Sequence, residues 1–146
     1  MNSDHLLLDA QICHRVYVLS NAITRAYRPL LKDLDITYPQ YVVMMALWEQ
    51  DDIVINQLLE KTLIDAGAMS LILKKLQAKS LISLNSSDID KRIKVLKLTT
   101  QGLSLKKLAM GIPAQLMCRA SSLSEEEINT LKSLTDKLNS DLLREI

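Results

Sequence analysis

Phenylalanine is absent from this chain of 146 residues, and glycine and proline occur only three times each. So few helix-breaking residues favour a mainly helical protein, and 48% hydrophobic with 24% charged residues excludes a disordered or low-complexity chain. No apolar run approaches the roughly 20 residues that span a bilayer, and the first residues lack the basic region of a signal peptide. We therefore expect a cytoplasmic protein with no membrane partner.

Cysteine and histidine are also scarce. Cys13 and Cys118 lie far apart in the sequence, and the two histidines are His5 and His14. No grouping of these residues has the spacing of metal ligands, so we expect no metal and no cofactor. From the residue type alone, Cys13 is expected to be an inert buried thiol, because free cysteine is among the most buried residue types.

The net charge of +1 conceals an uneven distribution of charge. Residues 1–73 carry a net charge of −4 and residues 108–146 carry −2, whereas nine basic and two acidic residues give residues 74–107 a net charge of +7. Such a basic block suits a surface that contacts nucleic-acid phosphates, because lysine and arginine displace condensed counterions. A solvated basic face without a partner is the alternative that charge alone leaves open.

The N-terminal part of the chain has helical periodicity. Apolar residues recur every three or four positions over residues 12–34, which is typical of an amphipathic helix that Pro29 bends or ends. Thr37 is the expected N-cap of the next helix, with Pro39 in its first turn. Residues 41–48 are apolar on every side, which predicts a helix buried at the centre of the domain.

Two short helical patterns follow, at residues 56–63 and 66–79. Asn56 and Asp65 are their expected N-caps. Two helices joined by so tight a turn are typical of a helix-turn-helix, whose second helix enters the major groove of DNA.

Two strands with a polar connection come next. Residues 81–84 and 94–98 have the composition and alternation of strands, and residues 85–92 between them are polar and rich in turn formers. A helix-turn-helix followed by such a hairpin is a winged helix. The predicted fold class is therefore mainly α with a small β-hairpin wing.

The C-terminal part is again helical. Residues 101–120 predict a helix that Pro113 kinks or interrupts. Ser124, followed three residues later by Glu127, fits a capping box for a final helix.

The apolar faces of the first and last helices are longer than the central unit can cover. A two-fold dimer built from these helices is the expected solution, and a self-contained helical bundle is the alternative. We predict one domain over residues 1–146, in which residues 37–100 form the winged helix-turn-helix and residues 1–36 and 101–146 form the dimerisation helices.

The chain resembles a known family over nearly the whole of its length, and four segments carry the resemblance. They are Leu8-Asp9-Ala10-Gln11-Ile12-Cys13, residues 23–31, Ile36-Thr37-Tyr38-Pro39-Gln40-Tyr41 and residues 90–99, the last with an Asp-x-Arg wing that ends in Leu-Thr. These segments resemble the organic-peroxide-sensing, OhrR-like branch of the MarR family, in its two-cysteine form. The resemblance implies a homodimeric winged-helix repressor that binds a near-palindromic DNA operator. It also implies that the operator is released when an organic hydroperoxide or related oxidant reacts with the N-terminal cysteine.

The resemblance implies redox roles for named residues. Cys13 matches the peroxide-reactive cysteine, and Cys118 matches the second cysteine, which closes an intersubunit disulfide. Tyr27 and Tyr38 match tyrosines whose hydroxyls approach the reactive sulfur, and Tyr17 lies one helical turn from Cys13. Along one straight helix, Tyr27 lies about 21 Å from Cys13, at roughly 1.5 Å per residue. Its hydroxyl can therefore reach a Cys13 sulfur only across a dimer whose first helices are antiparallel.

The resemblance also implies a DNA-binding surface, from which the chain departs in part. Arg92 matches a wing arginine that enters the minor groove, and Asp90 matches the acid that orients it. Where relatives carry small hydroxyl residues, this chain has Ala66, Ala68 and Leu71, which puts the operator sequence in question. We expect the DNA contacts to come from Ala68, Ser70, Lys74, Lys75, Asp90, Lys91 and Arg92.

Two other functions are left open by the residues. A repressor of the same fold could answer a small phenolic ligand in a pocket lined by Tyr17, Tyr38, Tyr41, Met44, Met45 and Trp48, although such residues are more often core. A thiol peroxidase could use Cys118 as its resolving thiol, but the helix-turn-helix and the basic block would then have no purpose. We therefore do not expect an enzyme.

Overall fold

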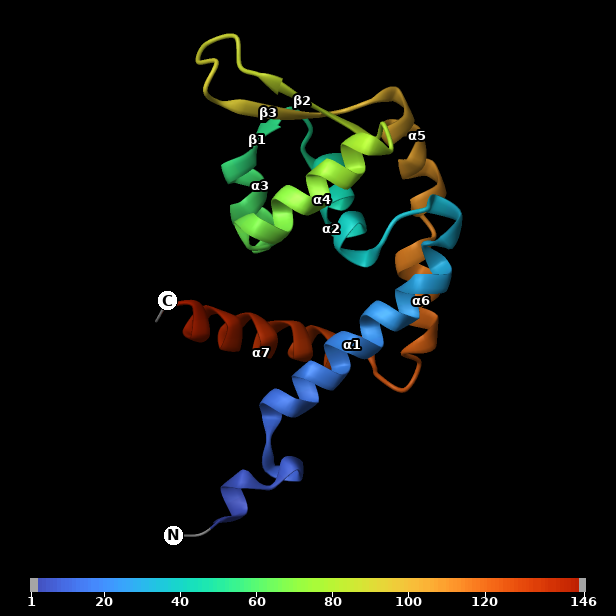
Figure 1. Cartoon of the computed structure of the whole chain (residues 1–146). Coiled ribbons are helices and arrows are strands. Elements are labelled where there is room, and N and C mark those ends of the chain that lie inside the picture. The colour runs from blue at the N-terminus through green and yellow to red at the C-terminus, as the bar shows by residue number, and fades with distance from the viewer. Residues whose placement is uncertain (1–2, 145–146) are drawn as a thin grey trace. The chain divides into compact units, whose positions relative to one another are not determined.

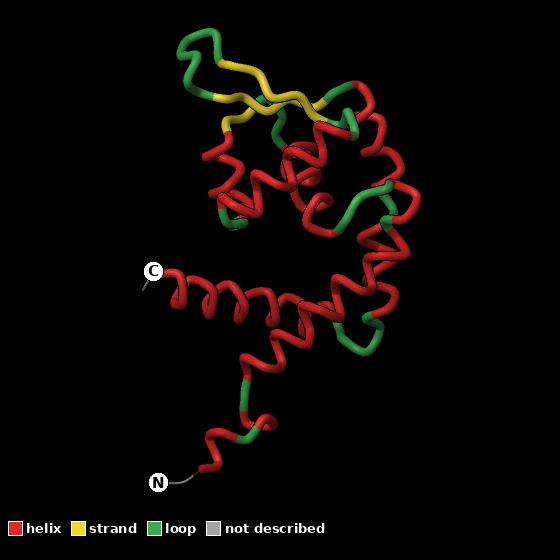
Figure 2. Tube along the Cα trace, in the orientation of Figure 1, coloured by secondary structure: helices red, strands yellow, loops and turns green. Residues whose placement is uncertain are grey.

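The computed structural model describes residues 3–144, which divide into one compact unit that ends at Ile112 and a second that begins at Pro113. Helices make up most of the described chain, and its strands form one three-stranded antiparallel sheet (Figures 1 and 2). This arrangement confirms the expected fold class.

The first unit begins with short 3-10 helices and one long helix. The 3-10 helices η1 (Ser3–Leu6) and η2 (Leu8–Ala10) precede α1 (Ile12–Leu30). Pro29 lies in the last turn of α1, so the helix ends at Leu30 and the 3-10 helix η3 (Lys32–Leu34) follows. The sequence prediction of a helix interrupted near Pro29 is confirmed.

Helix α2 (Tyr38–Glu49) forms the centre of the first unit. Its N-terminus has a side-chain cap in which the Thr37 N–H donates to Gln40 Oε1 at 3.1 Å. The helix buries side chains around most of its circumference, as the apolar composition of residues 41–48 predicts, and the buried ones include Tyr41, Val43, Met44, Ala46 and Leu47.

Helices α3 (Ile55–Thr62) and α4 (Ala66–Ala78) form the predicted helix-turn-helix. Asp65 caps α4 as expected, because its Oδ1 accepts the Ala68 N–H at 2.9 Å. The expectation that Asn56 caps α3 is wrong. Helix α3 begins at Ile55, and Gln57 closes its first turn by accepting the Val54 N–H at 3.1 Å.

The sheet has the strand order β1-β3-β2. Its strands are β1 (Ile53–Val54), β2 (Ile82–Ser86) and β3 (Lys94–Leu98), and the buried Leu96 of β3 faces Ile53 on one side and Leu84 on the other. Strand β1 was not expected, because two residues are too few to show alternation. Strand β2 also extends to Ser86, beyond the predicted end of its apolar residues, because the polar Asn85 and Ser86 pair with β3.

Helix α5 (Thr100–Ala109) starts directly against the sheet. Thr99 Oγ1 accepts the Gly102 N–H at 3.0 Å, and the indole Nε1 of Trp48 donates to the Gly102 oxygen at 2.9 Å. A Cβ atom at Gly102 would lie 2.1 Å from the main-chain oxygen of Leu81. Glycine is therefore required for this close approach.

The helix predicted over residues 101–120 is divided in two. Helix α5 ends at Ala109, and α6 (Ile112–Arg119) begins beyond Met110 and Gly111, with Pro113 as its second residue, where proline is tolerated. The second unit continues with α7 (Glu125–Leu143), whose predicted capping box is confirmed. The Ser124 N–H donates to Glu127 Oε2 at 2.8 Å, and the Glu127 N–H donates to Ser124 Oγ at 3.1 Å. In the described part of the chain, no helix is long and apolar enough to cross a membrane.

Candidate nucleic-acid interface and cysteine site

Helix α4 buries one side and exposes the opposite one. The buried side chains are Met69, Ile72, Leu73 and Leu76. At 3.6 residues per turn, positions 67, 71, 74 and 78 lie opposite them, and all four are exposed. Leu71, with 55% of its surface exposed, therefore lies in the middle of the outward face.

The two small DNA-binding candidates of α4 lie on its surface but offer few polar groups. Ala68 and Ser70 are both exposed. Ser70 Oγ donates its hydrogen to the main-chain oxygen of Ala66 at 3.0 Å. Ser70 is the only hydroxyl residue in the first two turns of α4, and its hydroxyl is thus used inside the helix as a donor.

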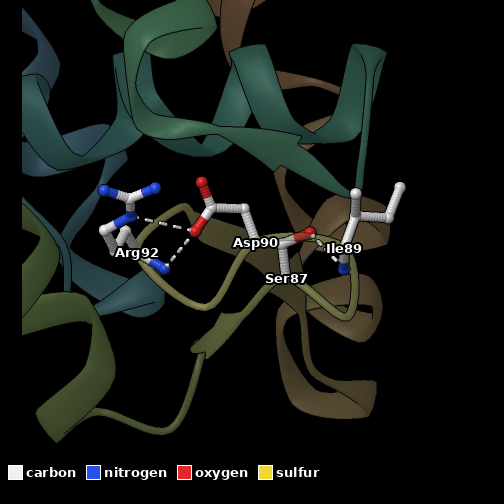
Figure 3. Close-up of polar contacts among 4 residues, drawn as sticks. All are labelled: Ser87, Ile89, Asp90 and Arg92. Carbon is white, nitrogen blue, oxygen red and sulfur yellow. Dashed lines mark hydrogen bonds and ion pairs between the residues drawn. The ribbon is translucent and has the colours of Figure 1, made fainter.

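The wing places an arginine on an ordered loop. Strands β2 and β3 are paired from Ile82 with Leu98 to Ser86 with Lys94, and residues 87–93 connect them. Asp90 Oδ1 accepts the Arg92 N–H at 2.9 Å and Arg92 Nε at 3.3 Å (Figure 3). The Arg92 side chain is nonetheless 93% exposed, so its guanidinium is oriented by Asp90 and remains available to a phosphate or a groove.

A hydrophobic residue beside this pair was not expected. Ile89 is 99% exposed in the same loop, where its N–H donates to Ser87 Oγ at 3.2 Å (Figure 3). An isoleucine between polar residues of a turn gives no periodic signal, so sequence reasoning did not find it.

The first unit exposes single lysines and has one groove lined by several cations. Lys74, Lys75 and Lys91, which the sequence predicts as phosphate contacts, are all exposed. A basic groove was not expected, because its members come from segments that are distant in the sequence. The groove, of about 620 Å³, is lined by basic residues of α1, η3, α4 and the α4 C-cap, namely Arg25, Arg28, Lys32, Lys75 and Lys79. Lys79 Nζ lies 3.1 Å from Asp35 Oδ2 and also donates to the Asp35 main-chain oxygen.

Both cysteines are exposed free thiols. Cys13 is the second residue of α1 and Cys118 is near the end of α6. The expectation from residue type alone, an inert buried Cys13, is therefore wrong for the isolated chain, because the face of α1 that carries it is uncovered. Tyr17, one turn further along α1, is 67% exposed. Within residues 3–144, no His, Cys, Asp or Glu side chains form a group of three or more that could hold a metal ion.

Tyr27 and Tyr38, which the resemblance places near the reactive sulfur, contact each other in the first unit. Their rings stack with centroids 4.5 Å apart, and the ring of Tyr41, which was not expected in this group, lies 5.7 Å from that of Tyr27. Burial raises the pKa of Tyr27, Tyr38 and Tyr41 above the ordinary value of 10.0, and for Tyr27 the two neighbouring phenols raise it further. All three are neutral at physiological pH and can donate a hydrogen bond.

The residues of the alternative phenol-binding pocket come together only in part. Tyr41 and Met44 are fully buried in the core, and the Trp48 ring packs edge-on against Tyr41 with centroids 6.1 Å apart. Tyr17 lies about 15 Å along α1 from Tyr27, at roughly 1.5 Å per residue, and is exposed. Tyr41 and Met44 therefore belong to the core, Tyr38, Met45 and Trp48 are half-buried, and Tyr17 lies apart from them on the surface of α1.

Comparison with known proteins agrees with this geometry. The profile of the family described as Transcriptional regulator SarA/Rot matches residues 25–108, more than half of the chain. The Organic hydroperoxide resistance transcriptional regulator of Bacillus subtilis (strain 168) is 35% identical over 130 residues, which cover 89% of this chain and 88% of that protein. The HTH-type transcriptional regulator SarZ of Staphylococcus aureus (strain MRSA252) is 30% identical over 141 residues, covering 94% and 95%.

A solved structure supports the fold. The structure of reduced AbfR bound to DNA superposes with a TM-score of 0.80 at 24% identity, over 99% of this chain and 98% of that one. The relatives are regulators of transcription rather than enzymes. The chain therefore belongs to the MarR/SarA-like family of winged-helix, DNA-binding transcriptional regulators.

Proposed function

We propose that this chain is a homodimeric cytoplasmic repressor that senses organic hydroperoxides, or a related oxidant, through Cys13. Oxidation joins Cys13 to Cys118 of the partner subunit and changes the affinity for operator DNA. The observation that carries the proposal is the accessible Cys13 thiol on an uncovered apolar face of α1. The Bacillus subtilis relative is named as an organic hydroperoxide resistance regulator, which supports this class of oxidant. A reducing compartment suits such a sensor, because its thiol then stays reduced until the oxidant arrives.

The apolar surface of the terminal helices supports a dimer. On α1, Ile12, Val16 and Leu19 are between 42% and 59% exposed. On α7, four leucines at helical spacing are 40% to 61% exposed, namely Leu131, Leu134, Leu138 and Leu142. Monomeric proteins rarely leave apolar helix faces of this kind in water, and a second copy of the chain covers each with the same residues. Residues 1–36 and 101–146 are accordingly assigned to dimerisation and residues 37–100 to DNA binding.

Tyrosines of the partner subunit complete the thiol site in this proposal. Tyr17 is on the same face of α1 as Cys13, but Tyr27 lies about 21 Å away along the helix. Two antiparallel α1 helices bring the Tyr27 and Tyr38 hydroxyls of one subunit toward Cys13 of the other. Because these phenols are neutral, each can donate a hydrogen bond that stabilises the thiolate.

The proposed oxidation has two steps, formation of a sulfenic acid on Cys13 and formation of the disulfide. The Cys13 thiolate attacks the terminal oxygen of the hydroperoxide, the O–O bond breaks, and the alkoxide leaves and is protonated to the alcohol. Cys13 then carries a sulfenic acid. The thiolate of the partner subunit's Cys118 attacks this sulfur, a disulfide forms, and hydroxide leaves and is protonated to water. The two electrons that reduce the peroxide come from the two thiols.

The DNA-binding surface consists of α4 and the wing. Lys74, Lys75 and Lys91 contact phosphates, Arg92 enters the minor groove with its guanidinium oriented by Asp90, and Ala68 and Ser70 face base edges. The half-sites of a dimer lie about one helical turn of DNA apart, so a change of a few ångströms in the spacing of the two α4 helices lowers affinity. A disulfide that draws α1 toward α6 of the partner subunit would produce such a change.

A non-reducing gel tests the switch directly. Purified protein is compared before and after one equivalent of cumene hydroperoxide, beside Cys13→Ser and Cys118→Ser as matched variants. The expected result is a band at twice the monomer mass that requires both cysteines, and a sulfenic acid that is trapped by dimedone on Cys13 in Cys118→Ser. An unmodified Cys13 and a monomer band in every lane would refute peroxide sensing through this thiol.

A further inference from the structure

The outward side of α4 has little capacity to hydrogen-bond with base edges. Ala66, Gly67 and Ala68 have no polar side-chain atoms, and the Ser70 hydroxyl donates to the main-chain oxygen of Ala66 at 3.0 Å. Asp65 Oδ1 accepts the Ala68 N–H. The first two turns of α4 therefore lack a side-chain donor that is free for DNA, whereas reading of guanine or adenine edges depends on side-chain donors.

The same region is apolar and open. Leu63 and Leu71 are 62% and 55% exposed, and together with the exposed Ala68 they line one groove of about 470 Å³ between the start of α2 and α4. We name Leu63, Ala68 and Leu71 the apolar α4 surface. Pro39 and Ile64 extend its apolar lining. Water contacts this surface in the free chain, so burial of the surface against an apolar group of a partner favours binding.

We propose that the apolar α4 surface recognises the C5-methyl groups of thymines in the major groove. The inference rests on the proposed placement of α4 in that groove. The thymine methyl is the apolar feature that the four bases present there, and alanine and other aliphatic side chains contact it. Lys74 and Lys75, one turn beyond the apolar α4 surface, are placed to hold the flanking phosphates.

The chemistry of the other bases reinforces this preference. An amino or carbonyl group of cytosine, guanine or adenine that is pressed against Leu71 loses its water without gaining a partner, which is unfavourable. A thymine methyl loses only unfavourable contact with water. A buried methyl group corresponds to about a fourfold change in affinity, so two contacted thymines per operator correspond to about sixteenfold.

Replacement of thymine by uracil removes only this methyl group. Reduced full-length protein first enriches a binding duplex from a random-sequence library. The enriched duplex is then synthesised with deoxyuridine at each thymidine position in turn, and its Kd is measured by fluorescence anisotropy. We expect about a fourfold loss at one or more positions in each half-site. Equal affinity at every uridine position would overturn the inference while leaving DNA binding intact, and failure to enrich any duplex would overturn the proposed function together with it.

Substitutions on α4 assign the effect to this surface. Leu71→Asn and Ala68→Ser alter exposed side chains, so circular dichroism should show an unchanged fold, and both should reduce the ratio of thymine to uracil affinity toward one. Lys74→Gln is the matched control: it should weaken binding to both duplexes equally and leave the ratio unchanged, because a phosphate contact carries no sequence information. A full thymine preference in the Leu71→Asn, Ala68→Ser double variant would place the methyl contact elsewhere and refute the assignment.

Discussion

The ordered wing can be tested through the contact between Asp90 and Arg92. Asp90→Ala removes the carboxylate that accepts both Arg92 hydrogen bonds, at 2.9 Å and 3.3 Å. In the proposed complex, the same change also removes a negative charge near DNA, which by itself favours binding. Asp90→Asn removes the charge equally but keeps the Oδ1 acceptor, so the comparison of these two variants isolates the orientation of Arg92.

The exposure of the Asp90 and Arg92 side chains sets the expected changes in stability and DNA affinity. The Arg92 side chain is 93% exposed and that of Asp90 is 37% exposed, so water screens the ion pair. Exposed pairs of this kind contribute about 0–1 kcal/mol. We therefore expect both variants to unfold within about 1 kcal/mol of the parent chain, and Asp90→Ala to bind DNA up to about fivefold more weakly than Asp90→Asn.

Fluorescence anisotropy with an enriched duplex gives the two dissociation constants, and urea unfolding gives the stabilities. The same pair of substitutions is repeated with Arg92→Ala, where the difference between alanine and asparagine at position 90 should vanish. Equal affinities of Asp90→Ala and Asp90→Asn in the parent chain, or a difference that persists without Arg92, would refute the view that Asp90 acts by orienting Arg92.

Three further predictions concern the first unit. Leu96→Ala truncates a fully buried leucine of the central strand and should lower the free energy of unfolding by about 2–5 kcal/mol in urea; a loss below about 1 kcal/mol would contradict its place in the core. Gly102→Ala should lower the free energy of unfolding by at least about 1–3 kcal/mol, because its Cβ would lie 2.1 Å from the Leu81 oxygen. In Gly67→Ala the Cβ would lie 3.3 Å from Asp65 Oδ1, so the free energy of unfolding should stay within about 1 kcal/mol of the parent chain. Equal melting temperatures of the two glycine variants would refute this contrast. Finally, burial raises the pKa of Tyr27, and the phenols of Tyr38 and Tyr41 raise it further. The folded chain therefore holds the phenolic proton of Tyr27 more tightly than the unfolded chain does. The resulting stabilisation is complete below about pH 10 and is lost as the pH rises above that value, so Tyr27→Phe should show a shallower alkaline loss of stability in urea titrations at pH 9 and 11. Parallel losses in both proteins would show that Tyr27 does not contribute.

Elements with strong local signals could be predicted from the sequence. The periodicity of residues 12–34, the apolar composition of residues 41–48 and the capping box of Ser124 each depend on nearby residues, and the structure has all three. Strand β1 and the cap of α3 could not be predicted. Strand β1 has two residues and exists because Ile53 pairs with Leu96, a contact distant in sequence.

In the candidate site, too, local contacts could be predicted from the sequence and contacts between distant segments could not. Asp90 and Arg92 are two positions apart, so their contact is local and could be expected from the wing pattern. Tyr27 and Tyr38 were named as site residues only through resemblance to a family, and their stacking on each other was not expected. Tyr41 was missed because a tyrosine within an apolar helix gives no signal beyond core packing. The basic groove of Arg25, Arg28 and Lys75 depends on tertiary folding, so charge counted along the chain does not detect it.

Near the end of α1, an ion pair reaches the C-cap of α4 and a ring stack reaches the start of α2, and their strengths decide which of these contacts can transmit the proposed switch. The ion pair joins Lys79, the C-cap residue of α4, to Asp35, whose side chain is 91% exposed. A pair so exposed contributes about 0–1 kcal/mol and yields easily to a displacement. The other is the ring stack of Tyr27 on Tyr38 at 4.5 Å, in which Tyr27 is 9% exposed. An aromatic pair contributes about 0.5–1.5 kcal/mol beyond the burial of its rings, and dense packing resists partial displacement. In the proposed switch, a movement of α1 would therefore pass to the start of α2 through the tyrosines. Since the groove beside α4 is lined by Thr37 and Pro39 at that same start of α2, the movement would reach α4 without dependence on the ion pair.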